Sequence, residues 1–383
     1  MSNTLQQLQE LGQSVWFDDI RRGLIESGGL QELIDLGVTG LTSNPTIFEK
    51  AVSGSTDYDD ALLSLAEQDL DATQIYEKLT IEDIQGAADL LRPIYDRTGG
   101  ADGYASLEVN PHLAHDTETT ISEAMRLFTA LGRPNVMIKV PGTPEGVPAI
   151  RSLISQGINV NVTLLFSLDA YRRASEAYVS GLEDLAASGG DIGPVASVAS
   201  FFISRVDTAV DVQLNERIAT GSVALKSLLG RAAVANAKLA YGDFKDTFTG
   251  PRFAQLKAKG ARVQRTLWGS TSVKNPEYSD VMYVDALIGS DTVNTMPEPT
   301  LRAFLDHGTA SERLERDLDG VADLTRGLDA AGISMEQVTT KLLADGVKAF
   351  ADSYDELLAN IERKRAALLA RQRDDSTAAR AGS

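Results

Sequence analysis

One lysine of the chain stands inside an apolar, β-branched run. Lys139 is the fourth residue of the run from Val136 to Gly142, which reads VMIKVPG. Burying an unpaired ammonium group is costly. Desolvation can lower a lysine pKa by about 3–5 units, which leaves a neutral amine near pH 7, the nucleophile of Schiff-base chemistry. The alternative is a lysine that reaches solvent or forms an ion pair at the end of a strand, and this run alone leaves both open.

Other polar residues occur where predicted strands end. They are Asp18 and Asp19, Thr42 and Asn44, Glu108, and Asn161 with Thr163. Each has an ordinary alternative use. Asp19 suits a helix N-terminus, and residues 42–45 are of the types that turns favour. Asn161 and Thr163 are two positions apart, so they point to the same face of a strand. The common position of these residues is what indicates a site.

Basic residues follow later strands and could hold a phosphate group. Arg205 comes just after the sixth predicted strand and Lys274 just after the seventh. Arginine suits phosphate because its fork donates two hydrogen bonds at once. Arg265, inside the seventh run, is a rival for this role, although a structural ion pair is its expected use. The sequence leaves open whether Lys274 or Arg265 is the second phosphate ligand.

The pattern that positions these residues alternates short apolar runs with amphipathic helical stretches. Because eight such runs occur in one chain, a parallel (β/α)8 TIM barrel is predicted, with catalysis at the carboxyl ends of its strands. A doubly wound open sheet is the rival, but no GxGxxG follows the first strand. The predicted strands are Ser14–Asp18, Val38–Thr42, Tyr104–Val109, Val136–Val140, Ile158–Thr163, Pro194–Ala199, Val263–Trp268 and Thr292–Thr295.

Additional helices are predicted at two places outside a minimal barrel. Between the second and third strands they fall at Asp57–Glu67 and Ile75–Leu91, and near the C-terminus at Met335–Leu369. We expect one domain over residues 1–370 and a disordered tail over residues 371–383, where small and polar residues gather. The added helices could shield the barrel mouth or form a homodimer contact.

Composition narrows the classes of function. The chain has 383 residues, no cysteine and a formal charge of −18. Cysteine-based catalysis, disulfides and thiolate metal sites are therefore excluded. The negative field disfavours nucleic acid and anionic membranes as partners. His112 and His115 lack a clear third ligand, so we expect no metal there. The N-terminus lacks a secretory signal and no apolar run could span a bilayer, so a cytoplasmic protein is expected.

Several blocks of the sequence, in this order, resemble transaldolases, specifically the longer bacterial form with an extended C-terminus. The resemblance covers nearly the whole chain, from about Ser14 to the helices before Arg371. The matching blocks are VWFDD (15–19), GLTSNPT (40–46), IKVP (138–141), GINVNVTLLFS (157–167), ASFFISR (199–205), LWGST (267–271), KNP (274–276) and VNTMP (293–297).

The resemblance implies a (β/α)8 barrel, no cofactor, and transfer of a dihydroxyacetone unit between sugar phosphates in the pentose phosphate pathway. It implies roles for ten residues. Lys139 would form the Schiff base, Asp18 would be the general acid/base, and Glu108 with Thr163 would hold a catalytic water. The substrate-binding positions would be Thr42, Asn44, Asn161, Ser200, Arg205 and Lys274. The last is often arginine in shorter members, and the lysine here keeps the charge and loses the fork.

Two alternatives remain beside this interpretation. A fructose-6-phosphate aldolase of the same superfamily would release free dihydroxyacetone and need no acceptor, but such lyases lack the extra helices. A catalytically silent protein would use its acidic C-terminal helices for partner binding. The intact Lys139, Asp18 and Glu108 argue against a silent protein.

Overall fold

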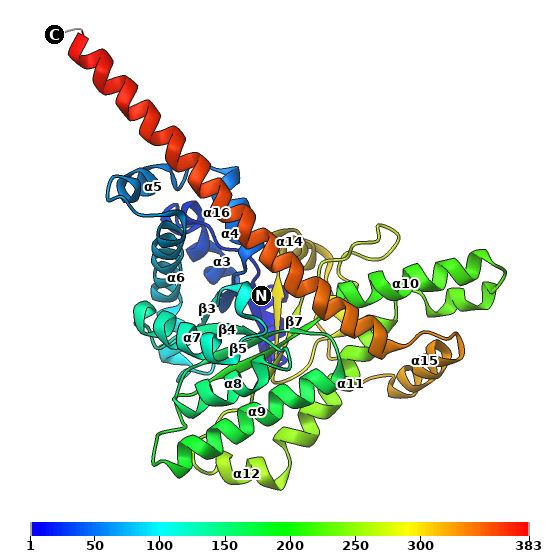
Figure 1. The fold of residues 1–383 in the computed structure, drawn as a ribbon. Helices are drawn as coiled ribbons and strands as arrows, with labels where there is room; N and C mark the ends of the chain where they lie inside the picture. The colour runs from blue at the N-terminus through cyan, green and yellow to red at the C-terminus, as the bar shows by residue number, and fades with distance from the viewer. Residues whose placement is uncertain (1, 382–383) are drawn as a thin grey trace.

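Eight parallel strands close into a barrel in chain order, and β8 pairs with β1. In the computed structural model, which describes residues 2–381 with side chains up to residue 373, helices surround this barrel (Figure 1). The (β/α)8 prediction is therefore confirmed. The strands are β1 (Gln13–Phe17), β2 (Gly40–Thr42), β3 (Ala105–Glu108), β4 (Val136–Pro141), β5 (Val160–Leu165), β6 (Ser197–Phe202), β7 (Arg265–Gly269) and β8 (Thr292–Met296).

Every predicted strand overlaps an observed one, and the boundaries shift most at β6. We predicted Pro194–Ala199, whereas the strand runs from Ser197 to Phe202. Proline has no N–H to donate to a strand ladder, so it belongs before the strand. At the other end, Phe201 and Phe202 continue the pairing with β7. The shift carries the strand up to the segment that begins α10 (Ser204–Ala219).

Large side chains fill the interior of the barrel below its carboxyl end. Trp16 of β1, Met137 of β4 and Val198 of β6 belong to one buried cluster with Leu267 and Val293. Gly40 of β2 makes room for the indole, because a Cβ there would come within 2.6 Å of Trp16. Since side chains alternate between faces, positions two residues further along each strand also point inward. That next inward layer contains the polar residues.

Helices connect the strands, and several are additions to the minimal barrel. Three of them lie between β2 and β3, namely α4 (Pro45–Gly54), α5 (Asp59–Ala66) and α6 (Ala72–Arg97). We predicted α5 and α6 but not α4, which starts where Asn44 accepts a hydrogen bond from the N–H of Ile47 and Pro45 takes the first helical position. The remaining helices are α1 (Thr4–Glu10), α2 (Arg22–Glu26), α3 (Gly29–Leu36), η1 (Pro111–Leu113), α7 (Thr117–Leu131), α8 (Gly146–Ser155), α9 (Leu168–Ala187), η2 (Val223–Leu228), α11 (Ala232–Phe248), α12 (Pro251–Lys257), α13 (Met282–Ala286), α14 (Glu298–His307), α15 (Leu318–Ala330) and α16 (Met335–Ala381).

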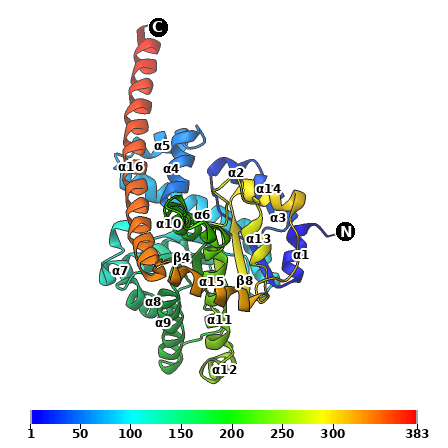
Figure 2. The same cartoon turned by 90° about the vertical axis from the view of Figure 1, so that its right-hand side faces the viewer.

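The C-terminal helix α16 is much longer than the others. It packs against α4, α5, α6 and α10, and its last turns extend beyond the body of the molecule (Figures 1 and 2). We expected a disordered tail from residue 371. The structure instead continues the helix through Ala381, in a segment containing the helix-favouring residues Arg, Gln and Ala. Residues 382–383 of that prediction lie outside the described residues.

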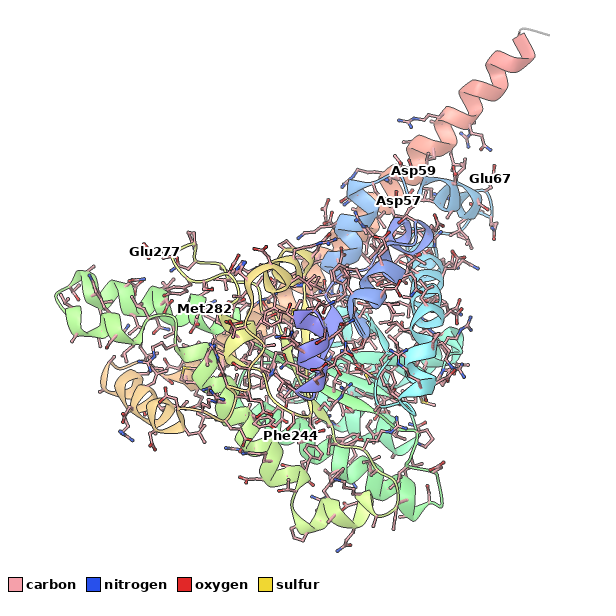
Figure 3. All side chains as sticks on the ribbon, turned by 180° about the vertical axis from the view of Figure 1, so that it is seen from behind. Asp57, Asp59, Glu67, Phe244, Glu277 and Met282 are labelled. Carbon is pink, nitrogen blue, oxygen red and sulfur yellow. The ribbon has the colours of Figure 1, made fainter. Side chains whose placement is uncertain are left out.

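Polar contacts fasten α16 to α4 and α5. The Lys364 ammonium lies 2.9 Å from Asp59, and the Asn360 side chain donates to Glu49 at 3.0 Å. Gln372 also donates to Glu67, and Figure 3 labels Asp59 and Glu67 on the side where α5 meets the helix. These contacts hold the middle of α16 at the carboxyl end of the barrel. Over residues 2–381, none of the helices combines the length and apolar character that crossing a membrane requires.

Candidate active site

A cavity of about 280 Å³ opens at the carboxyl end of the barrel and brings most of the predicted site residues together. Asn161 and Glu108 do not line this cavity, but each contacts a residue that does. The cavity therefore joins residues spread over more than 250 positions of sequence into one site. The predicted residues that line it are Asp18, Thr42, Asn44, Lys139, Thr163, Ser200, Arg205 and Lys274.

The period of two along the strands explains why these side chains converge. Lys139 comes two residues after the interior residue Met137, and Ser200 comes two after Val198. Asp18 likewise follows Trp16, and Thr42 follows Gly40. Each polar residue is thus the next inward position above the apolar interior. Catalytic groups at this end of the strands are the rule in (β/α)8 barrels.

Lys139 is buried, with 4% of its surface exposed. Its ammonium group donates one hydrogen bond, at 3.0 Å, to the main-chain carbonyl of Ser43. A carboxylate oxygen of Glu108 lies 3.4 Å from Nζ, and the ring of Phe350 on α16 lies 5.7 Å from it. The side chain is therefore held by few contacts and reaches the cavity, as an attacking amine must.

Glu108 shares the burial of this lysine but makes fewer bonds. Burial raises the pKa of its carboxyl to about 7, and the nearby Lys139 ammonium opposes that rise. Within the part of the chain that the structure describes, neither carboxylate oxygen has a hydrogen-bond partner, and the same is true of the Thr163 hydroxyl. Because buried polar atoms are normally paired, these groups are suited to act on a reacting molecule. A pKa near 7 lets the carboxyl both donate and accept protons at neutral pH.

Asp18 lies at the end of β1, where protein surrounds its carboxylate although part of it is reached from the cavity. The Thr42 hydroxyl donates to its Oδ1 at 2.7 Å. A second hydroxyl, that of Thr295 on β8, lies 2.7 Å from the Thr42 oxygen. Burial raises the pKa of Asp18, while Lys139 and the Thr42 hydrogen bond lower it. A buried carboxylate with a raised pKa is a better proton acceptor than a solvated one.

A chain of hydrogen bonds holds the amide of Asn161 at the floor of the site. Its Nδ2 donates to the Ser106 hydroxyl at 3.1 Å, and its Oδ1 accepts from the Ser200 hydroxyl at 2.7 Å. The strand β5 is irregular just beyond Thr163, where Leu164 has a φ of +59° and the register with β6 shifts. The hydrogen bonds fix the side chains of Asn161 and Ser200, and Asn161 pairs with Lys139 across the sheet. Such an arrangement suits the recognition of substrate hydroxyl groups.

The opposite side of the cavity is positively charged. Arg205 stands at the start of α10, with its guanidinium 5.4 Å from the ring centre of Phe202. Burial lowers the pKa of Arg205 and also that of Lys274, which the charges of Arg205 and Lys50 lower further. The cations therefore lie close to one another and are partly shielded from water. In a chain of net charge −18, this is a local site for an anion.

Comparison with known proteins agrees with this site. The family model of transaldolase/fructose-6-phosphate aldolase matches residues 15–361. The chain is 46% identical to the transaldolase of Trichodesmium erythraeum over 95% of its own length and 98% of the relative's. It is 48% identical to that of Thiobacillus denitrificans over 94% and 99% of the two chains. The chain belongs to the transaldolase/fructose-6-phosphate aldolase family. It is an enzyme of that family.

In this family member, α10 holds two cations of the cavity, Arg205 and Lys274, in place. It carries Arg205 in its first turn. The Ser204 N–H before it donates to the carbonyl of Ser270, at the start of the loop that carries Lys274, at 3.1 Å. Further along the helix, Asp211 accepts a hydrogen bond of 2.8 Å from the hydroxyl of Tyr278 in the same loop. The loop that presents Lys274 is thus tied at both ends to the helix that presents Arg205.

Two other sequence predictions concern residues outside the cavity. Arg265 is the first residue of β7, at the opposite end of the barrel, where it donates to the Ser14 hydroxyl at 2.6 Å and lies 3.5 Å from Asp102. It therefore forms a structural ion pair and lies outside the cavity that Lys274 lines. His112 and His115 contact different carboxylates, Asp355 and Glu145. Among the described residues, no group of three or more His, Cys, Asp or Glu side chains could hold a metal ion.

The lining residues of the transaldolase-family cavity that the sequence did not predict include Thr295, Lys50 and Phe350. Thr295 lies two positions after the interior residue Val293, so the period of two could have identified it. Lys50 lies on the unpredicted helix α4. Phe350 had only the spacing of a core residue, and nothing local indicates that it faces Lys139 from α16. Helix α16 approaches closely at Gly346, where a Cβ would lie 3.0 Å from Leu164.

Proposed function

We propose that this enzyme is a transaldolase that transfers a dihydroxyacetone unit from fructose 6-phosphate or sedoheptulose 7-phosphate to an aldose phosphate. The acceptors are glyceraldehyde 3-phosphate and erythrose 4-phosphate. The observation that carries this proposal is Lys139, buried, with few bonds, at the floor of a cavity whose other side is cationic. Membership of the family and the length shared with transaldolases support it.

The first step is the formation of a Schiff base. Glu108 first accepts a proton from the neighbouring Lys139 ammonium. The neutral amine then attacks the C2 carbonyl of the ketose, and the carbinolamine loses water to give an imine. Glu108 lies 3.4 Å from Nζ, within reach of the departing hydroxyl. In its protonated form Glu108 supplies the proton that leaves with the water. Thr163, whose hydroxyl has no partner among the described residues, holds that water beside it.

The second step breaks the bond between C3 and C4. Asp18 removes the proton of the C4 hydroxyl, the electrons of the C3–C4 bond move into the imine, and an aldose phosphate leaves. The three-carbon unit stays on Lys139 as an enamine. Asn44, Asn161 and Ser200 bind its hydroxyls, with Thr42 holding Asp18 in position. Polar groups that restrain this unit without protonating it favour its transfer over its release.

The third step returns the unit to a second aldose phosphate. The enamine carbon attacks the aldehyde, and Asp18 gives its proton to the new hydroxyl. Ionised Glu108 then activates a water that hydrolyses the imine. Arg205 and Lys274 bind the phosphate of each aldose, which places its aldehyde over the enamine. We assign the reaction to the non-oxidative pentose phosphate pathway in the cytoplasm, and no step requires a metal or organic cofactor.

Borohydride trapping tests the covalent intermediate. The enzyme is incubated with fructose 6-phosphate, reduced and digested, and the modified peptide is located by mass spectrometry. The expected product is a reduced dihydroxyacetone adduct on Lys139. An active enzyme without an adduct, or with an adduct on another lysine, would disprove the Schiff-base assignment.

Acceptor dependence separates a transferase from a lyase. With fructose 6-phosphate alone, a transaldolase should turn over only until its lysine is loaded, and addition of erythrose 4-phosphate should restore turnover. Continuous release of free dihydroxyacetone without an acceptor would instead show a fructose-6-phosphate aldolase.

A further inference from the structure

We propose that Lys50 is a third phosphate-binding residue, supplied by α4 on a different wall of the cavity from Arg205 and Lys274. This inference rests on the proposed function, because it assigns the residue to the sugar-phosphate site. The resulting pocket would recognise a phosphate monoester from three elements: α4, the start of α10 and the loop after β7.

The turn of α4 directs Lys50 toward the cavity. Thr46 and Ile47 line the same cavity and lie four and three positions before Lys50, so all three share one face of the helix. The other side of the helix is buried through Phe48 and Val52. Because α4 also packs against α16, the direction of Lys50 is set by the fold.

The charge around Lys50 is also unusual for a surface lysine. Over the described residues, no hydrogen bond or ion pair joins its ammonium to another group, whereas Lys341 and Lys348 each pair with an aspartate four positions on. The charge of Lys50 lowers the pKa of Lys274, so the two ammonium groups interact. Asp18 is the carboxylate that lines the cavity with these three cations, so positive charge is in excess there, and a bound dianion offsets that excess.

The chemistry of the ligand matches three cations. A phosphate monoester carries a charge of about −1.5 to −2 at neutral pH and presents three acceptor oxygens. Arg205 can hold two oxygens through its fork, and a lysine binds as a point charge. Lys50 therefore adds a third cation to the one fork and the one point charge that Arg205 and Lys274 provide.

The test compares phosphorylated and unphosphorylated ligands in Lys50→Gln, Lys50→Arg and Arg21→Gln. Arg21 is the matched control, because it is exposed near the mouth but lines a neighbouring cavity instead of this one. We expect Lys50→Gln to weaken the binding of inorganic phosphate, measured by calorimetry, roughly five- to twentyfold. It should raise the KM for erythrose 4-phosphate by a similar factor and leave the KM for erythrose within about twofold. Lys50→Arg should restore most of the loss.

Three results would overturn the inference. The first is unchanged phosphate affinity and KM in a folded Lys50→Gln variant. The second is an equal loss in Arg21→Gln, which would show a general field of the mouth instead of a site. The third is an equal loss with erythrose. Phosphate binding does not require turnover, and borohydride trapping on Lys139 is measured separately, so failure of this inference is distinguishable from failure of the proposed function.

Discussion

The two ends of the barrel each set a basic residue against a buried carboxylate, and they do so in opposite ways. At the amino end, Asp102 accepts hydrogen bonds from Ser14, from the Trp16 indole at 2.8 Å and from the Gly103 N–H at 3.1 Å, with Arg265 beside it. At the carboxyl end, the Lys139 ammonium, at 3.4 Å, is the only partner of Glu108 among the described residues. The protein therefore satisfies the hydrogen-bonding capacity of Asp102, whereas that of Glu108 stays open among the described residues.

This difference shows that the fold places a stabilising ion pair and a reactive carboxyl at opposite ends of the barrel. A buried carboxylate surrounded by donors has its hydrogen bonds satisfied and locks the strands that supply those donors. A buried carboxylate without donors has a raised pKa and gives or takes protons instead. Helix α16 completes the contrast, because its Phe350 closes the side of the reactive pair while the amino end needs no such cover. Four substitutions test the comparison.

The largest expected effect is that of Lys139→Met. The proposed mechanism needs this amine for its Schiff base, so transfer activity should fall by more than about 10,000-fold. The free energy of unfolding at pH 6.5 should change by less than about 1 kcal/mol. The reason is that losing the ammonium removes what lowers the Glu108 pKa, so Glu108 is neutral there and needs no partner. Activity assays and urea unfolding measure both quantities. Retained transfer in this variant would end the assignment.

The matching change at the other end is Arg265→Met, and its effect should be the reverse. Asp102 would lose its cation but keep its other donors, so the loss of stability should be about 2–3 kcal/mol, below the roughly 3–5 kcal/mol of breaking a fully buried pair. The kcat per folded molecule should stay within about twofold, because Arg265 lies far from the cavity. A loss of activity without a loss of stability would show that the two ends are not separate in function.

Both basic residues of this comparison could be recognised from the sequence, and their positions along the strands distinguish them. The strands were predictable because apolar, β-branched runs recur eight times, and Lys139 was anomalous because it interrupts one of them. Arg265 interrupts a run too, but it stands at the first position of β7, which places it at the amino end. Position along the strand, not burial alone, separates the two roles.

The residues that the sequence did not predict depend on long-range packing. Phe350 reaches Lys139 only because α16 returns across the barrel mouth more than 200 residues later in the chain. The acceptor of the Lys139 hydrogen bond is a main-chain carbonyl, that of Ser43, which any residue could provide. Helix α4 was hidden because Asn44 and Pro45 have the same types in a turn as at a helix start. Neither spacing nor composition records such contacts.

The third test changes the reactive carboxylate itself. In the wild type, the rate of imine formation should fall as pH rises through about 7, because deprotonated Glu108 can no longer protonate the departing hydroxyl. Glu108→Gln should lower that rate about 100-fold and remove this limb of the pH profile. Rapid-quench borohydride trapping at several pH values measures the rate. A limb near pH 7 that persists in the variant would assign the ionisation to another group.

The smallest expected effect is that of Tyr278→Phe, which extends the comparison to residues that support the site without touching the reacting atoms. The Tyr278 hydroxyl ties the Lys274 loop to Asp211 at 2.8 Å. One such bond contributes about 1 kcal/mol, so the KM for phosphorylated acceptors should rise roughly fivefold while kcat and the KM for erythrose change little. Tyr241→Phe is the control, because its hydroxyl bonds to Ser290, outside the cavity. If both variants raised KM equally, the effect would come from general loosening, and the tie from α10 would have no part in positioning Lys274.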